Sequence, residues 1–125
     1  MKIVLLSGKP GSGKTTTLND VYNELVDDDK DRIDCPKAQV GANPLDFECV
    51  VTFHEKKIAL FTAGDYLWQC VESIIKYAWV DVLIQAYSDR FSTELNTIIG
   101  RYDCHVVVDK TASNDDDCKK IIGHL

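Results

Sequence analysis

KIVLLSGKPGSGKTTTLNDVYNELV, residues 2–26, joins a short apolar run to a glycine-rich turn and then to an amphipathic segment. The apolar run, residues 2–6, is bounded by the glycine-rich turn, which is typical of a buried strand. In residues 14–26 the apolar side chains recur at helical spacing, which predicts one buried helix face: Leu18, Val21, Tyr22, Leu25 and Val26. The chain therefore begins with a strand, a glycine-rich loop and a helix.

The loop matches the pattern G-x-x-x-x-G-K-[ST] at residues 8–15 without a mismatch. Glycines allow the backbone to wrap closely around phosphate oxygens and to take positive φ. The amides of such a loop and the following helix N-terminus bind anions. Lys14 would contact the β- and γ-phosphates, and the Thr15 hydroxyl would bind Mg²⁺. We expect nucleotide phosphates to contact this set of residues: Gly8, Pro10, Gly11, Ser12, Gly13, Lys14, Thr15 and Thr16.

On this motif the chain resembles the P-loop nucleoside triphosphatase superfamily. The resemblance is carried by residues 2–26 of 125. It implies a nucleoside triphosphate as substrate, Mg²⁺ as cofactor and attack on the γ-phosphoryl group, with Lys14 as a catalytic residue.

The rest of the chain alternates mostly between strand and helix patterns, in the order β-α-β-β-α-β-α-β-α. This order predicts a single domain, residues 1–125, with a three-layer α/β/α fold and a mostly parallel five-stranded sheet. Two apolar runs joined by HEKK predict a hairpin whose antiparallel strand lies at the sheet edge. The expected strands are residues 2–6, 47–53, 57–63, 81–87 and 105–109, and the expected helices are residues 14–26, 65–78, 91–99 and 113–125.

The segment 27–46 lacks a periodic apolar pattern and contains an aspartate run, two prolines and a glycine. We expect a long loop, which in a compact domain is usually functional or disordered. A protein partner or a second copy of the chain is expected to act through it. In the helix 65–78 the spacing predicts an inward face that includes Trp68: Leu67, Trp68, Val71, Ile74, Ile75 and Ala78.

Mg²⁺ needs an acidic group besides Thr15, and Asp65, Asp89 and Asp109 stand near predicted strand ends. Asp65 follows an apolar strand directly, so we expect it to hold the metal; it would equally serve as the N-cap of the next helix. Asp109 ends the last strand, where it would contact the nucleoside base or form a turn.

The hairpin after a long loop is similar to the arrangement in small GTPases. In that family the second hairpin strand ends in D-T-A-G, whereas this chain has Phe61-Thr62-Ala63-Gly64. The guanine-reading N-K-x-D motif would correspond to residues 109–112, which read DKTA. Because both motifs depart from the family, we expect ATP rather than GTP.

The chain also resembles nucleotide and small-molecule kinases of the P-loop class, which clamp phosphates with arginines. Arg90, just past the strand 81–87, is the best placed of three arginines to reach a γ-phosphate, and we expect it to be catalytic. It would otherwise be a solvated residue at a helix start. Hydrolysis is the first expectation; phosphotransfer to a small acceptor and nucleotide sensing without turnover are the alternatives.

The composition excludes other classes of function. The formal net charge of −6 argues against general binding to nucleic acids or anionic membranes. No apolar run reaches the length of a membrane span, and no two of the five cysteines have C-x-x-C spacing. We therefore expect a cytoplasmic protein without a zinc site.

Overall fold

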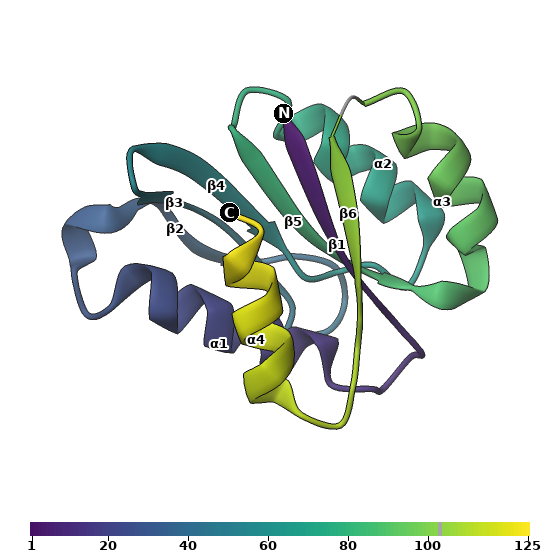
Figure 1. Ribbon diagram of the computed structural model, residues 1–125, viewed down its shortest axis with the longest axis horizontal. Coiled ribbons are helices and arrows are strands. Elements are labelled where there is room, and N and C mark those ends of the chain that lie inside the picture. The colour runs from purple at the N-terminus through teal and green to yellow at the C-terminus, as the bar shows by residue number, and fades with distance from the viewer. Residues whose placement is uncertain (103) are drawn as a thin grey trace.

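The computed structural model describes residues 1–102 and 104–125, and it has four helices packed on a six-stranded sheet (Figure 1). The strands are β1 (Lys2–Gly8), β2 (Ile33–Gln39), β3 (Phe47–Phe53), β4 (Lys56–Phe61), β5 (Val82–Ser88) and β6 (His105–Asp109). The α-helices are α1 (Lys14–Val26), α2 (Leu67–Lys76), α3 (Ser92–Ile99) and α4 (Asn114–Gly123). Single 3₁₀ turns precede β2 (η1, Lys30–Arg32) and α3 (η2, Asp89–Phe91).

The sheet has the order β2-β3-β4-β5-β1-β6. β1 lies between β5 and β6 and is parallel to both, and β4 is parallel to β5. β3 is antiparallel to β2 and β4. All of these strands except β3 therefore run in the same direction, and β3 begins at the end of the sheet where β4, β5, β1 and β6 have their carboxyl ends.

Helices cover both faces of the sheet, as expected for three layers (Figure 1). Val4 and Leu6 of β1 belong to a core that also contains side chains of α1 and α4. Ile3 and Leu5, which alternate with them, belong to a second core beneath α2 and α3. This alternation explains why β1 reads as a continuous apolar run: both of its faces are buried.

The predictions of five strands and of an antiparallel edge strand were wrong. β2 forms within the expected loop 27–46 and pairs with β3, so β3 lies one strand inside the edge. The sequence of β2, IDCPKAQ, is almost wholly exposed, and the pairing of β2 with β3 is interrupted by register shifts. An exposed edge strand of this kind lacks the alternating apolar pattern that identifies strands from sequence.

The helix α1 buries the predicted face, whereas α2 is rotated relative to the prediction. Trp68 and Ile75 of α2 are 60% and 72% exposed, and Ala78 is exposed as well. Ile74 is buried as predicted, but Cys70, Ser73 and Tyr77 are buried beside it in place of Trp68, Ile75 and Ala78. Polar contacts explain the difference, because the buried Ser73 hydroxyl donates to the Gln85 side chain inside the second core.

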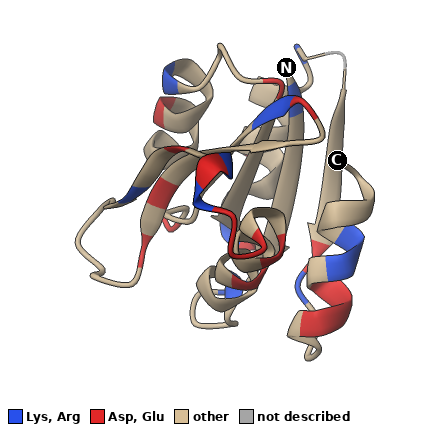
Figure 2. Ribbon diagram, turned by 90° about the vertical axis from the view of Figure 1, so that its left-hand side faces the viewer, with Lys and Arg blue, Asp and Glu red and all other residues tan. Residues whose placement is uncertain are grey.

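The charges of α4 follow the direction of its helix dipole. Asp115, Asp116 and Asp117 lie in its first turn, while Lys120 lies in the last (Figure 2). Acidic side chains near the N-terminus and basic side chains near the C-terminus stabilise a helix. Among the helices of the described residues, none is long and apolar enough to cross a membrane.

Candidate functional site

The glycine-rich loop between β1 and α1 has the backbone that its sequence predicts. Gly11 and Gly13 have φ of 76° and 93°, a region that favours glycine. A Cβ on Gly8 would lie 2.7 Å from Ser12 Oγ and 2.9 Å from Lys110 Cβ. Gly13 is the N-cap of α1, and no side chain caps this helix end. The first amides of α1 are therefore left for an external anion.

Lys14 lies under this loop, with its ammonium directed back onto the loop carbonyls. Its Nζ donates to the carbonyl oxygens of Gly8 at 3.1 Å and Lys9 at 2.8 Å. The residue is only 8% exposed. Burial lowers the pKa of Lys14, and this effect outweighs the opposing influence of the nearby Asp65, Asp89 and Asp46 carboxylates. None of these carboxylates lies within 4.0 Å of the ammonium, so a phosphate would add an anion in direct contact with it.

Asp46 joins the loop to the hairpin β3–β4. Its Oδ1 accepts hydrogen bonds from the Thr15 hydroxyl at 2.8 Å and from the Thr62 hydroxyl at 2.9 Å. The Thr62 hydroxyl also accepts from the Phe47 amide at 2.9 Å. Asp46 is 8% exposed and Thr62 is 4% exposed. Thr15, which the sequence predicts to bind Mg²⁺, is therefore hydrogen-bonded to the Asp46 carboxylate. The contact with Thr62 keeps that carboxylate in a fixed position.

A cavity of about 270 Å³ lies next to the loop, with Gly11, Lys14, Asp46 and Asp65 among its walls; it is called the phosphate cavity below, after the ligand that the sequence predicts for it. The donor set suits Mg²⁺, which takes oxygen ligands and keeps several waters beside one or two carboxylates and the substrate phosphates. Thr15 and Asp46 would hold the metal, with Asp65 on the same wall. The described residues contain no group of three or more His, Cys, Asp or Glu side chains arranged to hold a metal by themselves.

Asp65 lines the same cavity as Lys14 and Asp46, but it does not cap the next helix. Tyr66, and not Asp65, is the N-cap residue of α2, and its amide donates to the Gln69 side chain at 3.1 Å. Arg90 lies beside this segment: its guanidinium donates to the Asp65 carbonyl and lies 5.7 Å from the Tyr66 ring centroid. Arg90 is thus next to the phosphate cavity without lining it.

Thr16 and Asp109 line two different cavities beside the loop. Thr16 lines a larger cavity between α1 and β2, described below. Asp109 pairs with Ser7 at the end of β6, and together with Gly8, Lys9 and Ser12 it lines a cavity of about 500 Å³. Its contact with a nucleoside base stays a prediction. Pro10 is exposed at the loop tip, and Ser12 lines both this cavity and the phosphate cavity.

Lys110, which follows Asp109, is held by an ion pair inside the protein. Its Nζ lies 2.8 Å from Asp117 Oδ2, and the two side chains are 3% and 0% exposed. The amide and hydroxyl of Thr111 also donate to Asp117, at 2.9 and 2.8 Å. Burial alone would raise the pKa of Asp117, but the hydrogen bonds from Lys110 and Thr111 prevail and the pKa is lowered.

We predict that Asp117 stabilises the fold in a pH-dependent way. Because its folded pKa lies below the unfolded value, the stabilisation is present above about pH 4 and is lost as the pH falls through the folded pKa. Asp117→Asn should lower the free energy of unfolding by about 2 kcal/mol at pH 7, the scale of hydrogen bonds to a charged group. Urea unfolding at pH 7, 4 and 3 measures this. A difference from the wild type that stays constant over this range would contradict the prediction.

Comparisons of the chain with protein-family models, with curated proteins and with solved structures find no match. The interpretation of the site therefore depends on its own geometry and on the loop motif.

Asp46 and Thr62 are the site residues that the sequence reasoning missed. The acidic residues predicted from sequence, Asp65, Asp89 and Asp109, all stand near the carboxyl ends of strands. Asp46 stands immediately before the apolar run of β3. Because β3 is antiparallel to β4, it begins at the end of the sheet where the parallel strands have their carboxyl ends. The position of an acidic residue directly before a predicted antiparallel strand was the available signal.

Proposed function

We propose that this protein binds a nucleoside triphosphate with Mg²⁺ and hydrolyses its γ-phosphoryl bond. The observation that carries the proposal is the contact of Thr15 with Asp46 beside a phosphate-binding loop with an uncapped helix. The motif, the positive-φ glycines and the buried Lys14 support the same ligand. The domain would belong to the P-loop class in fold and would be an ATPase.

Each residue of the site has a distinct role in this proposal. The loop amides and the N-terminus of α1 bind the phosphates, and Lys14 leaves the Gly8 and Lys9 carbonyls to contact the β- and γ-phosphates. Bound Mg²⁺ would neutralise charge on the phosphate oxygens. Thr15 and Asp46 orient its coordination sphere, and the fixed donors stabilise charge that develops in the transition state. Asp65 lines the cavity, and Arg90, which donates to the Asp65 carbonyl from outside it, would have to turn inward to reach the γ-phosphate.

ATP is the proposed nucleotide because the segment after β6 is engaged within the protein. Lys110 and Thr111, which stand where a guanine-reading motif would be, both donate to Asp117. Both groups are therefore committed to an internal contact. Shifts in melting temperature with ATP, GTP, ADP and GDP, each with and without Mg²⁺, test this choice, because specific binding raises the melting temperature by mass action. A larger shift with GTP would contradict it.

A second candidate function is transfer of the γ-phosphoryl group to a small acceptor. It is favoured by the larger cavity, which shares Thr15, Leu45 and Asp46 with the phosphate cavity. Water can reach the γ-phosphate without such a space, whereas an acceptor needs one. Release of inorganic phosphate from ATP by the protein alone supports hydrolysis. Negligible release under conditions of saturating ATP would favour transfer or sensing.

We predict that Asp46→Asn weakens the Mg²⁺-dependent affinity for ATP by roughly tenfold or more, the usual cost of losing a carboxylate that orients a metal ligand. Asparagine keeps an Oδ1 acceptor for the Thr15 and Thr62 hydroxyls, so the fold should be retained. Isothermal titration with ATP in Mg²⁺ and in EDTA gives the measurement.

Asp65→Asn is the matched variant for this experiment, since Asp65 lines the same cavity without contacting Thr15. A loss with Asp65→Asn and none with Asp46→Asn would return the metal to Asp65, the assignment made from sequence. Equal affinities in both variants and the wild type would contradict a carboxylate-assisted metal site.

A further inference from the structure

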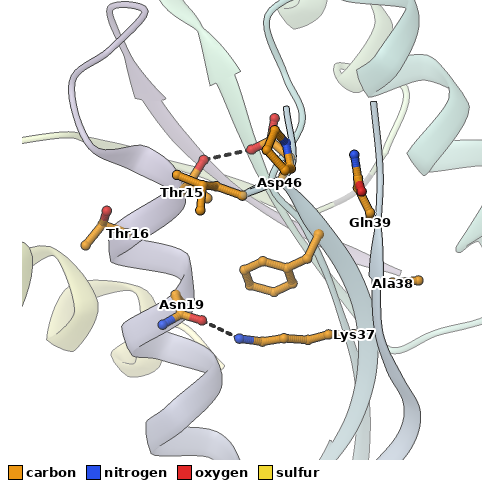
Figure 3. Close-up of a pocket in the computed structure, with 10 residues that line it drawn as sticks. Thr15, Thr16, Asn19, Lys37, Ala38, Gln39 and Asp46 are labelled. Carbon is orange, nitrogen blue, oxygen red and sulfur yellow. Dashed lines mark hydrogen bonds between the residues drawn. The ribbon is translucent and has the colours of Figure 1, made fainter. Parts of the chain in front are cut away.

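A cavity of about 440 Å³ lies between α1 and β2, with Phe47 of β3 among its walls (Figure 3). Its volume lies within the range of small-molecule sites. Thr15 and Asp46 stand at one end of it, where it adjoins the phosphate cavity. A molecule bound here would therefore lie against the terminal phosphate of a bound nucleotide.

One wall of this cavity presents a cation without an acidic partner. Lys37 on β2 and Asn19 on α1 point toward each other, and the Lys37 ammonium donates to Asn19 Oδ1 (Figure 3). Although the residue as a whole is exposed, its Nζ lies 4.2 Å from the Tyr22 ring centroid and 4.4 Å from that of Phe47. In the described part of the chain, no carboxylate lies within 4.0 Å of it.

The surroundings of Lys37 differ from those of Lys14. Three carboxylates oppose the lowering of the Lys14 pKa by burial, whereas burial lowers the pKa of Lys37 without an opposing Asp or Glu. Aromatic faces stabilise a cation but leave its net charge in place. A charged group that is partly removed from water and unpaired is stabilised by an anion that enters beside it.

Apart from Lys37, Asn19 and the end at Thr15 and Asp46, most of the lining is apolar, and this lining defines the body of the ligand. Ala38, Pro44, Leu45 and Phe47 line the cavity, and Leu45 is 74% exposed at its rim. Thr16 and Gln39 add a hydroxyl and an amide. We propose that this cavity binds a small organic anion, a carboxylate or a phosphate ester with an apolar body, whose charged group pairs with Lys37. The binding of this anion needs no nucleotide. Only the further role of the anion as a phosphoryl acceptor rests on the proposed function.

The test uses three probes: 3-phenyllactate for the carboxylate, phenyl phosphate for the phosphate, and 3-phenyl-1,2-propanediol as the neutral analogue of phenyllactate. Each is titrated into the nucleotide-free protein and followed by amide and side-chain NMR shifts. At least one anion should give saturable shifts at Asn19, Lys37 and Gln39. Lys37→Met should weaken that binding at least tenfold, while the neutral diol should bind both proteins equally.

Lys57→Met is the matched control, because Lys57 pairs with Asp34 and lies outside this cavity. It should bind the anions like the wild type. The proposal is overturned if neither anion binds, if Lys37→Met binds them unchanged, or if shifts occur only at Gly11 to Lys14. It is also overturned if ATP alone shifts Lys37 and displaces phenyllactate, since the cavity then holds the nucleoside. Anion binding at Lys37 with no nucleotide binding would refute the proposed function alone.

Discussion

Lys14→Ala should lower the rate of phosphate release from ATP by at least about 100-fold, the scale for removing one preorganised transition-state donor. The structure gives the reason: Lys14 is the cation buried beneath the loop, and the carbonyls of Gly8 and Lys9 that now accept from it are neutral. Those contacts are readily exchanged for phosphate oxygens. Steady-state phosphate release at saturating Mg²⁺ and ATP is the measurement.

The same variant should keep its fold. Because burial lowers the pKa of Lys14, its charged form is disfavoured in the protein, and removing it should leave the melting temperature unchanged or higher. Lys56→Ala is a suitable control, since Lys56 begins β4 and so lies at the opposite end of the strands from the loop. Equal rates in the wild type and Lys14→Ala would overturn the assignment of the site.

Gly64→Ala should destabilise the protein by about 3 kcal/mol or more, through a backbone clash in the core. A Cβ at this position would lie 1.8 Å from the Ala86 carbonyl oxygen and 2.7 Å from Tyr87 Cα. The Ser88 amide donates to the Gly64 carbonyl at 2.8 Å, so the segment after β4 is held against the end of β5. Neither backbone can move away without losing this contact.

Gly123→Ala provides the comparison, because a Cβ there meets nothing within 4 Å. In a helix this substitution is stabilising by roughly 0.5–1 kcal/mol. Thermal unfolding of both variants should thus give shifts of opposite sign. If the melting temperature of Gly64→Ala lies within a degree or two of the wild-type value, the close approach of Gly64 to β5 is wrong. Gly64→Ala should also weaken nucleotide binding, since Gly64 lies two residues after Thr62 and directly before Asp65.

The opening 26 residues determine by themselves the glycine-rich loop and its helix. Their contacts are local: a buried strand, glycines with positive φ, and an apolar stripe repeated at helical spacing. The α/β class and the layers also follow from the sequence, because β1 must bury both faces. Short-range periodicity and local stereochemistry are the properties that sequence patterns report directly.

The tertiary structure decided the rest of the site. Asp46 is 31 residues from Thr15, and the two meet only because β3 runs antiparallel and begins where the parallel strands end. The exposed edge strand β2 places Lys37 across from Asn19, although its own sequence shows no strand pattern. The outward turn of Trp68 depends on a polar contact between α2 and β5. These features arise from pairing between distant segments, which local periodicity does not encode.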